Sequence, residues 1–395
     1  MHRRQFCLSS ASLGAASLAP AISWAQSPIG SRPGYENLLI LVELKGGNDG
    51  LNTVVPFADS AYRVLRPRLG IARDQVLQLD DKVGLHPALQ ALMPLWQKQE
   101  LAVVQGLGYP QPNLSHFRSI EIWDTASRAE QYLPDGWLTR AFAARPTPAT
   151  FSADGVNIGS QELGPLAGGA RAVALANTEQ FLSNARLAAP ASTRNNAVLA
   201  HLLKVESDIV TAADGFRPRG ERMQFKTEFP RGAFGDAIKT AAHIVASGEQ
   251  SGRPVAVLRL SLGSFDTHQN QAGTHAGLLT QLAEGLAALK SAMEEMQRWD
   301  RTTVMTYAEF GRRPKENLSV GTDHGTVAAH FILGGKVKGG LFGATPDLSR
   351  LDGSGNLPYA LDFRSVYASL LEKAWGLDST AILGGRFSTL DLLRS

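Results

Sequence analysis

The sequence predicts an α/β fold with a doubly wound, largely parallel sheet that is flanked by helices. Continuous apolar stretches of strand length at residues 37–44, 101–105 and 255–262 are typical of strands buried on both faces. Stretches with helical periodicity separate them, and strands that alternate with helices favour a parallel sheet. Polar loops follow these strands, and such loops meet at the carboxyl edge of an open sheet, where ligands bind.

The first half of the chain supplies two strands and two helices. Residues 37–44 form the first predicted strand, which ends in a turn-forming cluster at 45–50. Residues 86–97 carry apolar side chains at helical spacing and predict a helix, and the second strand follows at 101–105. Two prolines then precede a predicted helix at 113–123.

Residues 145–250 have a different character. Loops rich in Gly, Ala and Pro come first, and helical stretches follow at 196–211 and 233–247. We interpret this region as an insertion or cap over the sheet.

The remaining elements restore the strand–helix alternation. The third strand, at 255–262, leads into a polar loop and a long amphipathic helix at 276–298. A fourth strand is predicted at 302–307, and residues 331–334 belong to a fifth. A length of 395 residues suits one large α/β domain or two smaller ones.

Residues 1–25 have the regions of an export signal. Arg3 and Arg4 precede a mildly apolar, small-residue stretch, and the segment ends in Ser-Trp-Ala at Ala25. The paired arginines resemble the twin-arginine (Tat) signal, which predicts contact with the Tat translocase and a periplasmic or secreted protein. The apolar stretch is too short and too polar for a stable membrane span. We expect cleavage after Ala25.

Composition excludes several classes of function. The formal net charge is +3, and Arg3 and Arg4 of the signal supply two of these charges. Because the chain has no cationic run with interleaved aromatic residues, a nucleic-acid partner is not expected. Cys7, the single cysteine, lies in the signal, so the processed protein would have no thiolate site. The sequence also contains no Gly-x-Ser-x-Gly and no phosphate-loop motif.

Four clusters carry side chains suited to chemistry. They are residues 46–52, residues 113–117, residues 265–270 with His275, and residues 321–325 with His330. Carboxylates and imidazoles together suit zinc, manganese or similar ions. Structural alternatives exist: Asp49 as a turn residue, Ser115 as a helix cap, and the segment beginning at Asp266 as a cap of the helix that follows. Asp323 and His324, flanked by glycines, form the most specific cluster.

Several motifs resemble those of a secreted family known as domain of unknown function 1501. They are GGNDGLN, SHF, FDTHQNQ, and AEFGRR followed by GTDHG and HFILGG. The resemblance runs from about Leu38 to the C-terminus. That family is similar to the superfamily of alkaline phosphatases, sulfatases and cofactor-independent phosphoglycerate mutases. The resemblance therefore implies an alkaline-phosphatase-like domain over residues 34–395.

The resemblance also implies residue roles. In that superfamily an Asp after the first strand and a later Asp-His pair bind one metal ion, which corresponds here to Asp49, Asp323 and His324. A hydroxyl nucleophile lies beside that ion at a helix N-terminus. The candidate here is Ser115, and its neighbour His116 is the second candidate for a catalytic role.

A second metal ion is implied as well. Its ligands would be Asp266, His268 and His330. Two cations can stabilise the attacking and leaving oxygens of an in-line displacement. Four basic side chains could hold the remaining oxygens of an anionic ester, and the sequence does not choose among them: Arg118, Arg312, Arg313 and Lys315.

The predicted function is that of an exported metal-dependent hydrolase or transferase of a phosphate or sulfate ester. The expected partner is an anionic ester, including one carried on an exported polymer. The alternative is a secreted binding or scaffold protein that retains the fold and has lost catalysis.

Overall fold

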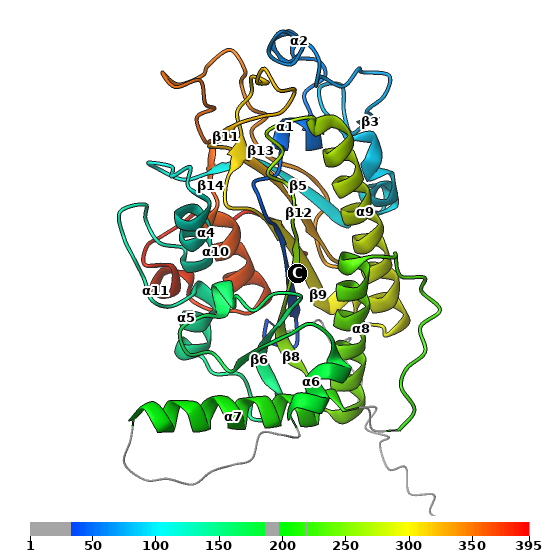
Figure 1. Ribbon diagram of the computed structural model, residues 1–395, viewed down its shortest axis with the longest axis vertical. Coiled ribbons are helices and arrows are strands. Elements are labelled where there is room, and N and C mark those ends of the chain that lie inside the picture. The colour runs from blue at the N-terminus through cyan, green and yellow to red at the C-terminus, as the bar shows by residue number, and fades with distance from the viewer. Residues whose placement is uncertain (1–32, 186–196, 218–219, 395) are drawn as a thin grey trace, which may run out of the picture. The chain divides into compact units, whose positions relative to one another are not determined.

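The computed structural model describes residues 33–185, 197–217 and 220–394 (Figure 1). Within these residues nine strands form one main sheet, in the order β13-β5-β12-β9-β1-β8-β6-β7, with β14 also pairing with β5. The strands are β1 (Leu38–Leu44), β5 (Leu101–Gly108), β6 (Ala153–Ile158), β7 (Ala172–Leu175), β8 (Val255–Leu262), β9 (Thr302–Tyr307), β12 (Ala328–Leu333), β13 (Gly340–Gly343) and β14 (Leu361–Asp362). Only β12 pairs antiparallel with its neighbours in this sheet. The predicted fold class is confirmed.

Helices cover both faces of the sheet (Figure 1). One face packs against α4 (His116–Thr125), α5 (Trp137–Ala144), α10 (Arg364–Ser369) and α11 (Ser379–Leu383). The other packs against η1 (Pro87–Leu92), α3 (Met93–Gln97), α6 (Thr178–Ala185), α7 (Ala197–Phe216), α8 (Ala233–Ser251) and α9 (Gln271–Glu295). Both faces need this cover because the strands carry apolar side chains on both sides. In strand β1 the residues alternate between two hydrophobic cores, with Ile40 in one and Leu41 in the other.

Smaller elements lie outside the main sheet. They are α1 (Gly50–Thr53), α2 (Ser60–Leu65), the strands β2 (Val54–Val55), β3 (Leu77–Gln78) and β4 (Gly84–Leu85), the hairpin of β10 (Gly311–Arg312) and β11 (His324–Gly325), and the short helices η2 (Gly164–Leu166), η3 (Trp299–Arg301) and η4 (Leu370–Ala374). Strands β10 and β11 pair antiparallel and project from the carboxyl side of β9. This hairpin contributes to the candidate site.

Predicted and observed elements differ in instructive places. The helix predicted at 86–97 is a 3-10 helix followed by the short helix α3, because Pro94 enters its first turn. The helix predicted from residue 113 begins at His116 instead. Asn113 accepts a hydrogen bond from the backbone N–H of Ser115 at 2.8 Å, which holds the preceding turn outside the helix.

Residues 145–250 do more than the expected insertion or cap would do. Strands β6 and β7 lie in this region, and they extend the main sheet beyond β8 in parallel. These two strands were not predicted from the sequence, because β6 contains the poor strand formers Asp154, Gly155 and Asn157 and because β7 has only four residues. The domain boundary at residue 34 stays a prediction.

The export signal at 1–25, with its cleavage after Ala25, lies outside the described residues, and the assignment stays a prediction. Among the described helices, none combines the length and the apolar character that crossing a membrane requires.

Candidate metal centre

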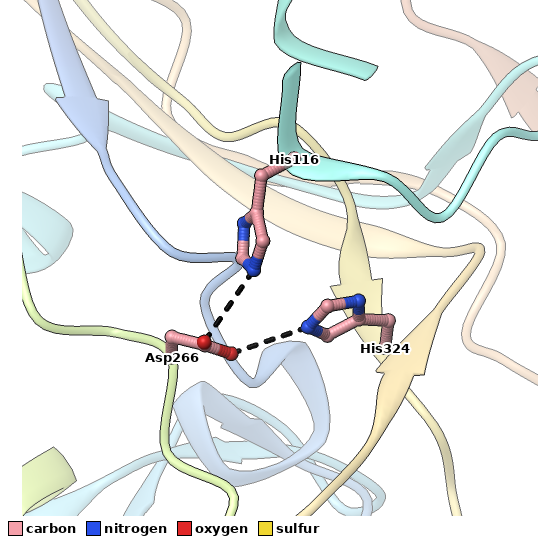
Figure 2. Close-up of side chains that lie close together, drawn as sticks. All are labelled: His116, Asp266 and His324. Atoms are coloured by element: carbon pink, nitrogen blue, oxygen red, sulfur yellow. Dashed lines mark hydrogen bonds and ion pairs between the residues drawn. The ribbon is translucent and has the colours of Figure 1, made fainter. Parts of the chain in front are cut away.

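Three side chains from distant parts of the chain meet above the carboxyl edge of the sheet. Figure 2 shows His116, Asp266 and His324 pointing toward one another. His116 is the first residue of α4, Asp266 lies in the loop after β8, and His324 begins β11. One potential ligand atom of each residue lies within 4.8 Å of the other two. The group is therefore compact enough to hold one metal ion.

The carboxylate of Asp266 is the centre of this group. Its Oδ2 lies 3.4 Å from Nε2 of His116, and its Oδ1 lies 3.2 Å from Nε2 of His324. Burial alone would raise the pKa of Asp266, but the hydrogen bond and charge of Arg312 outweigh burial and hold this pKa below its ordinary value. Asp266 is therefore an anion at neutral pH.

Both histidines are held by their other ring nitrogen. Nδ1 of His324 lies 2.8 Å from the carbonyl oxygen of Leu114, and Nδ1 of His116 lies 2.8 Å from Oε1 of Glu309. A carbonyl or a carboxylate can only accept, so each Nδ1 carries the hydrogen. In the neutral ring, Nε2 then presents its lone pair to Asp266. This arrangement is typical of histidines that bind metal ions.

His268 and Asp323 border the group. Nε2 of His268 lies 3.0 Å from Oδ1 of Asp266 and 3.0 Å from Nε2 of His324. Nδ1 of His268 lies 3.4 Å from Oδ1 of Asp323, which also accepts a hydrogen bond from Asn317 at 3.1 Å. His268 thus contacts two members of the group, and Asp323 contacts His268.

Arg312 joins the loops that carry these residues. Its buried guanidinium binds Oδ1 of Asp266 at 2.6 Å. It also donates to four backbone carbonyls, those of Gly46, Gly47, Phe265 and Thr322. Arg312 therefore acts as an internal tie, with its donors committed to the protein.

Asp49 lies outside the group. Its carboxylate is fully buried and forms a bidentate ion pair with Arg66, at 2.5 and 2.9 Å. Burial would raise the pKa of Asp49, but Arg66 outweighs burial and lowers it. The resemblance implied that Asp49, Asp323 and His324 share one ion. The structure instead brings His324 to Asp266 and pairs Asp49 with an arginine.

His330 also lies outside the group. It sits in β12 with its ring centre 5.4 Å from that of Trp123, and burial lowers its pKa to about 3. Within the described part of the chain, its Nε2 has no hydrogen-bond partner. His330 faces the core because β12 is an internal antiparallel strand between β5 and β9.

Ser115 is the residue before α4 and is exposed beside His116. Its hydroxyl makes no capping hydrogen bond to the helix. The alternative of a side-chain cap therefore has no support here, and the hydroxyl is free to meet a ligand.

Two residues of this region escaped sequence reasoning, Glu309 and Arg66. Glu309 follows β9 by two residues, so the rule that ligands bind beyond the carboxyl ends of strands could have found it. Arg66 is the residue at which α2 ends, and no sequence pattern around it predicts its ion pair with Asp49.

The sequence matches the model of the family described as Protein of unknown function (DUF1501) over residues 36–382. The chain belongs to this family. Among curated proteins, none matches the sequence.

Several solved structures match the chain at low identity and with TM-scores below 0.5. The PsFucS1 sulfatase from Pseudoalteromonas sp. has a TM-score of 0.41 and 10% identity, with 91% of this chain and 71% of that chain covered. The C-terminal periplasmic domain of EcEptC from Escherichia coli, in complex with Zn, has a TM-score of 0.37 and 9% identity, covering 77% and 73%. The phosphonate monoester hydrolase of Agrobacterium radiobacter has a TM-score of 0.39 and 10% identity, covering 90% and 78%.

Proposed function

We propose that this member of the DUF1501 family is a metal-dependent hydrolase or transferase of a phosphate or sulfate ester. One observation carries the proposal: Nε2 of both His116 and His324 faces the carboxylate of Asp266, while Nδ1 of each ring is held by an acceptor. Nitrogen lone pairs directed at an anion repel it unless a cation or a proton lies between them. A divalent cation at this point satisfies all three side chains.

The donor set fits zinc, manganese or a similar ion. Imidazole nitrogens and a carboxylate oxygen are ligands that these ions share, and His268 offers a further nitrogen. Such a cation lowers the pKa of a bound hydroxyl and neutralises charge on the oxygens of an ester in displacement.

Ser115 is the nucleophile in this proposal. Its exposed hydroxyl precedes His116 directly, at the start of the ten-residue helix α4. A helix N-terminus presents free N–H groups and a positive dipole end, which favour an anion at that place. In this proposal His116 is a ligand of the metal ion and does not accept the proton of the Ser115 hydroxyl.

Arg313 is our candidate among the basic side chains for holding a further oxygen of the ester. Arg312 is committed to Asp266 and to carbonyls, and Nη2 of Arg118 donates to three backbone carbonyls of the loop 128–131. Arg313 follows β10 directly, and within the described residues its buried Nε has no hydrogen-bond partner, which is also true of Nε of Arg118. Lys315 is exposed to solvent.

The substrate would be met outside the cytoplasm. Residues 1–25 predict Tat export, so we propose a periplasmic or secreted location and an anionic ester that is available there. An ester carried on an exported polymer fits this description.

The test is metal analysis of the exported protein together with a panel of aryl phosphates and aryl sulfates. We expect at least one bound divalent ion per chain and turnover of one ester class. His324→Ala should remove both, whereas His243→Gln, a histidine change in α8 outside the group, should remove neither. A protein without metal, unaffected by chelators and inactive on both classes would instead be a binding or scaffold protein.

A further inference from the structure

Asp49 has no capacity left for a metal ion. Its Oδ1 accepts hydrogen bonds from the backbone N–H of Leu51 at 3.2 Å and from Arg66 at 2.9 Å. Its Oδ2 accepts from Arg66 at 2.5 Å and from Nε2 of Gln271 at 2.5 Å. An ionised carboxylate offers about four acceptor positions, so protein donors fill them all. The carboxylate of Asp49 therefore acts through the protein groups that donate hydrogen bonds to it.

Gln271 connects Asp49 to two loops of the candidate metal centre, the loop 265–270 with Asp266 and the loop 317–324 with His324. Its side chain is fully buried, and its Oε1 accepts from the hydroxyls of Thr267 at 3.0 Å and Thr322 at 2.6 Å. Thr267 lies between Asp266 and His268, and Thr322 directly precedes Asp323. One carboxamide therefore bridges the two loops at the positions next to their polar side chains.

The backbones of the two loops are also joined. Gln271 donates its N–H to Val320 at 2.9 Å, and Thr322 donates to Thr267 at 3.2 Å. The loops approach so closely that a Cβ on Gly321 would lie 2.2 Å from the carbonyl carbon of His268. The carboxamide of Gln271 therefore lies where the two loops are in close contact.

Asp49 determines the orientation of this carboxamide. A carboxylate accepts only, so it must face the NH₂ of Gln271, which leaves the amide oxygen for the two threonine hydroxyls. Arg66 neutralises Asp49, and it also donates to the carbonyls of Arg313 and Pro314 beside the β10–β11 hairpin.

We propose that Asp49 and Gln271 are positioning residues: they set the distance between the loops 265–270 and 317–324, and Asp49 itself binds no cation. Its effect on the metal centre passes through Gln271. The inference rests on the proposed function in so far as the group binds a cation.

The first variant is Gln271→Met, which removes the three hydrogen bonds and leaves the Asp49–Arg66 pair intact. The probe is Co²⁺, with binding followed by titration and by visible absorption. We expect the affinity for Co²⁺ to fall by about 10–100-fold, the size of effect typical of groups that orient metal ligands. The absorption spectrum should keep its shape, because the ligands are the same. Gln105→Met, at a buried glutamine of β5, should leave the affinity unchanged.

Asp49→Asn separates positioning from ligation. A positioning residue changes affinity without changing the Co²⁺ spectrum, and its effect should largely vanish in the Gln271→Met background, since contacts in one network are not additive. An altered spectrum, or fully additive losses in the double variant, would overturn the inference.

Hydrogen exchange of the metal-free protein supplies a readout that requires neither cation nor activity. Gln271→Met should speed exchange at the amides of residues 267–271 and 320–322 together, relative to Gln105→Met. Unchanged exchange in both loops would contradict the positioning role. If the natural protein binds no Co²⁺ and cleaves no ester, the proposed function fails, and the exchange rates still decide this inference.

Discussion

Nδ1 of His116 lies 2.8 Å from Oε1 of Glu309, whose side chain is 3% exposed. The same oxygen accepts the backbone N–H of Gly46 at 2.9 Å, so Glu309 ties the start of α4 to the loop after β1. A carboxylate in this place fixes the ring of His116 and makes its Nε2 a stronger donor of electrons. Glu309 therefore supports the group of His116, Asp266 and His324 without belonging to it.

Glu309→Gln should weaken divalent cation binding by about 10–100-fold, because the charge that strengthens His116 is lost. Titration of the metal-free protein with Zn²⁺ measures this change. Asp154→Asn is a suitable control, since Asp154 is a buried carboxylate that pairs with Arg171 far along the sheet in β6. Equal losses in the two variants would mean that general destabilisation, and not the orientation of His116, explains the effect.

Ser115→Ala should retain the fold and bound metal while abolishing ester hydrolysis. The hydroxyl is exposed and makes no cap bond, so its loss should change the free energy of unfolding by less than the ~1 kcal/mol typical of a working cap. Thermal unfolding, metal content and turnover of the ester that the natural protein hydrolyses are measured on one preparation. Turnover equal to that of the natural protein would exclude Ser115 as the nucleophile and direct attention to another hydroxyl or to water.

His324→Ala should lower metal content more than Asp323→Asn does. His324 directs Nε2 at Asp266, whereas Asp323 is 52% exposed and reaches the group through His268. Because an ion that binds only the folded state stabilises it, added Zn²⁺ should raise the Tm of Asp323→Asn and have little effect on His324→Ala. The reverse order would favour Asp323 as a direct ligand.

Export should require both Arg3 and Arg4, since the Tat pathway recognises a guanidinium pair and lysine does not reproduce its geometry. Replacing both with Lys should leave the precursor in the cytoplasm. Cell fractionation detects this, and N-terminal sequencing of the natural protein should begin at Gln26. Normal processing of the double-Lys form would remove the Tat assignment.

The carboxyl-edge rule predicted more of the site than any single motif did. The polar loops of Asp266 and His324 were expected to converge because they follow buried strands, and the structure brings these two side chains together. Their roles as metal ligands came from the family resemblance, which assigned them to two different ions. The fold class followed from local properties, namely apolar runs and helical periodicity. Internal strands of the sheet can be predicted in this way, because burial on both faces requires consecutive apolar residues.

The partners of Asp49 and His330 could not be read in the same way. Whether a turn carboxylate binds a metal ion or an arginine depends on where Arg66 folds, and Arg66 lies 17 positions away, with no periodic signal. His330 follows His324 closely in sequence, but it belongs to the internal strand β12, and its ring packs against Trp123. Direction and long-range pairing are tertiary properties, and a single sequence records them weakly.

Asp124 is a half-buried acid that the proposed chemistry does not use. It lies on α4, and the hydroxyl of Tyr307 is 3.3 Å from its Oδ1. Two further charges act on it: Arg259 of β8 and Glu43 of β1, which form an ion pair with each other at 2.7 Å. Burial raises the pKa of Asp124 to about 7, because the attraction of Arg259 compensates only in part and Glu43 repels a second negative charge.

The sign of the pH dependence follows. In the unfolded chain Asp124 loses its proton near pH 4, whereas in the folded protein it keeps the proton to about pH 7. The folded state therefore binds more protons between these values, and its stability falls as pH rises from about 4 to 7, by at most about 4 kcal/mol from this group. Asp124→Asn removes that dependence, so urea unfolding at pH 5 and pH 8 should show a smaller loss than in the natural protein. Asp391→Asn, at an exposed acid, should keep the natural difference. An unchanged difference in Asp124→Asn would mean that Asp124 is ionised in the folded protein throughout this range.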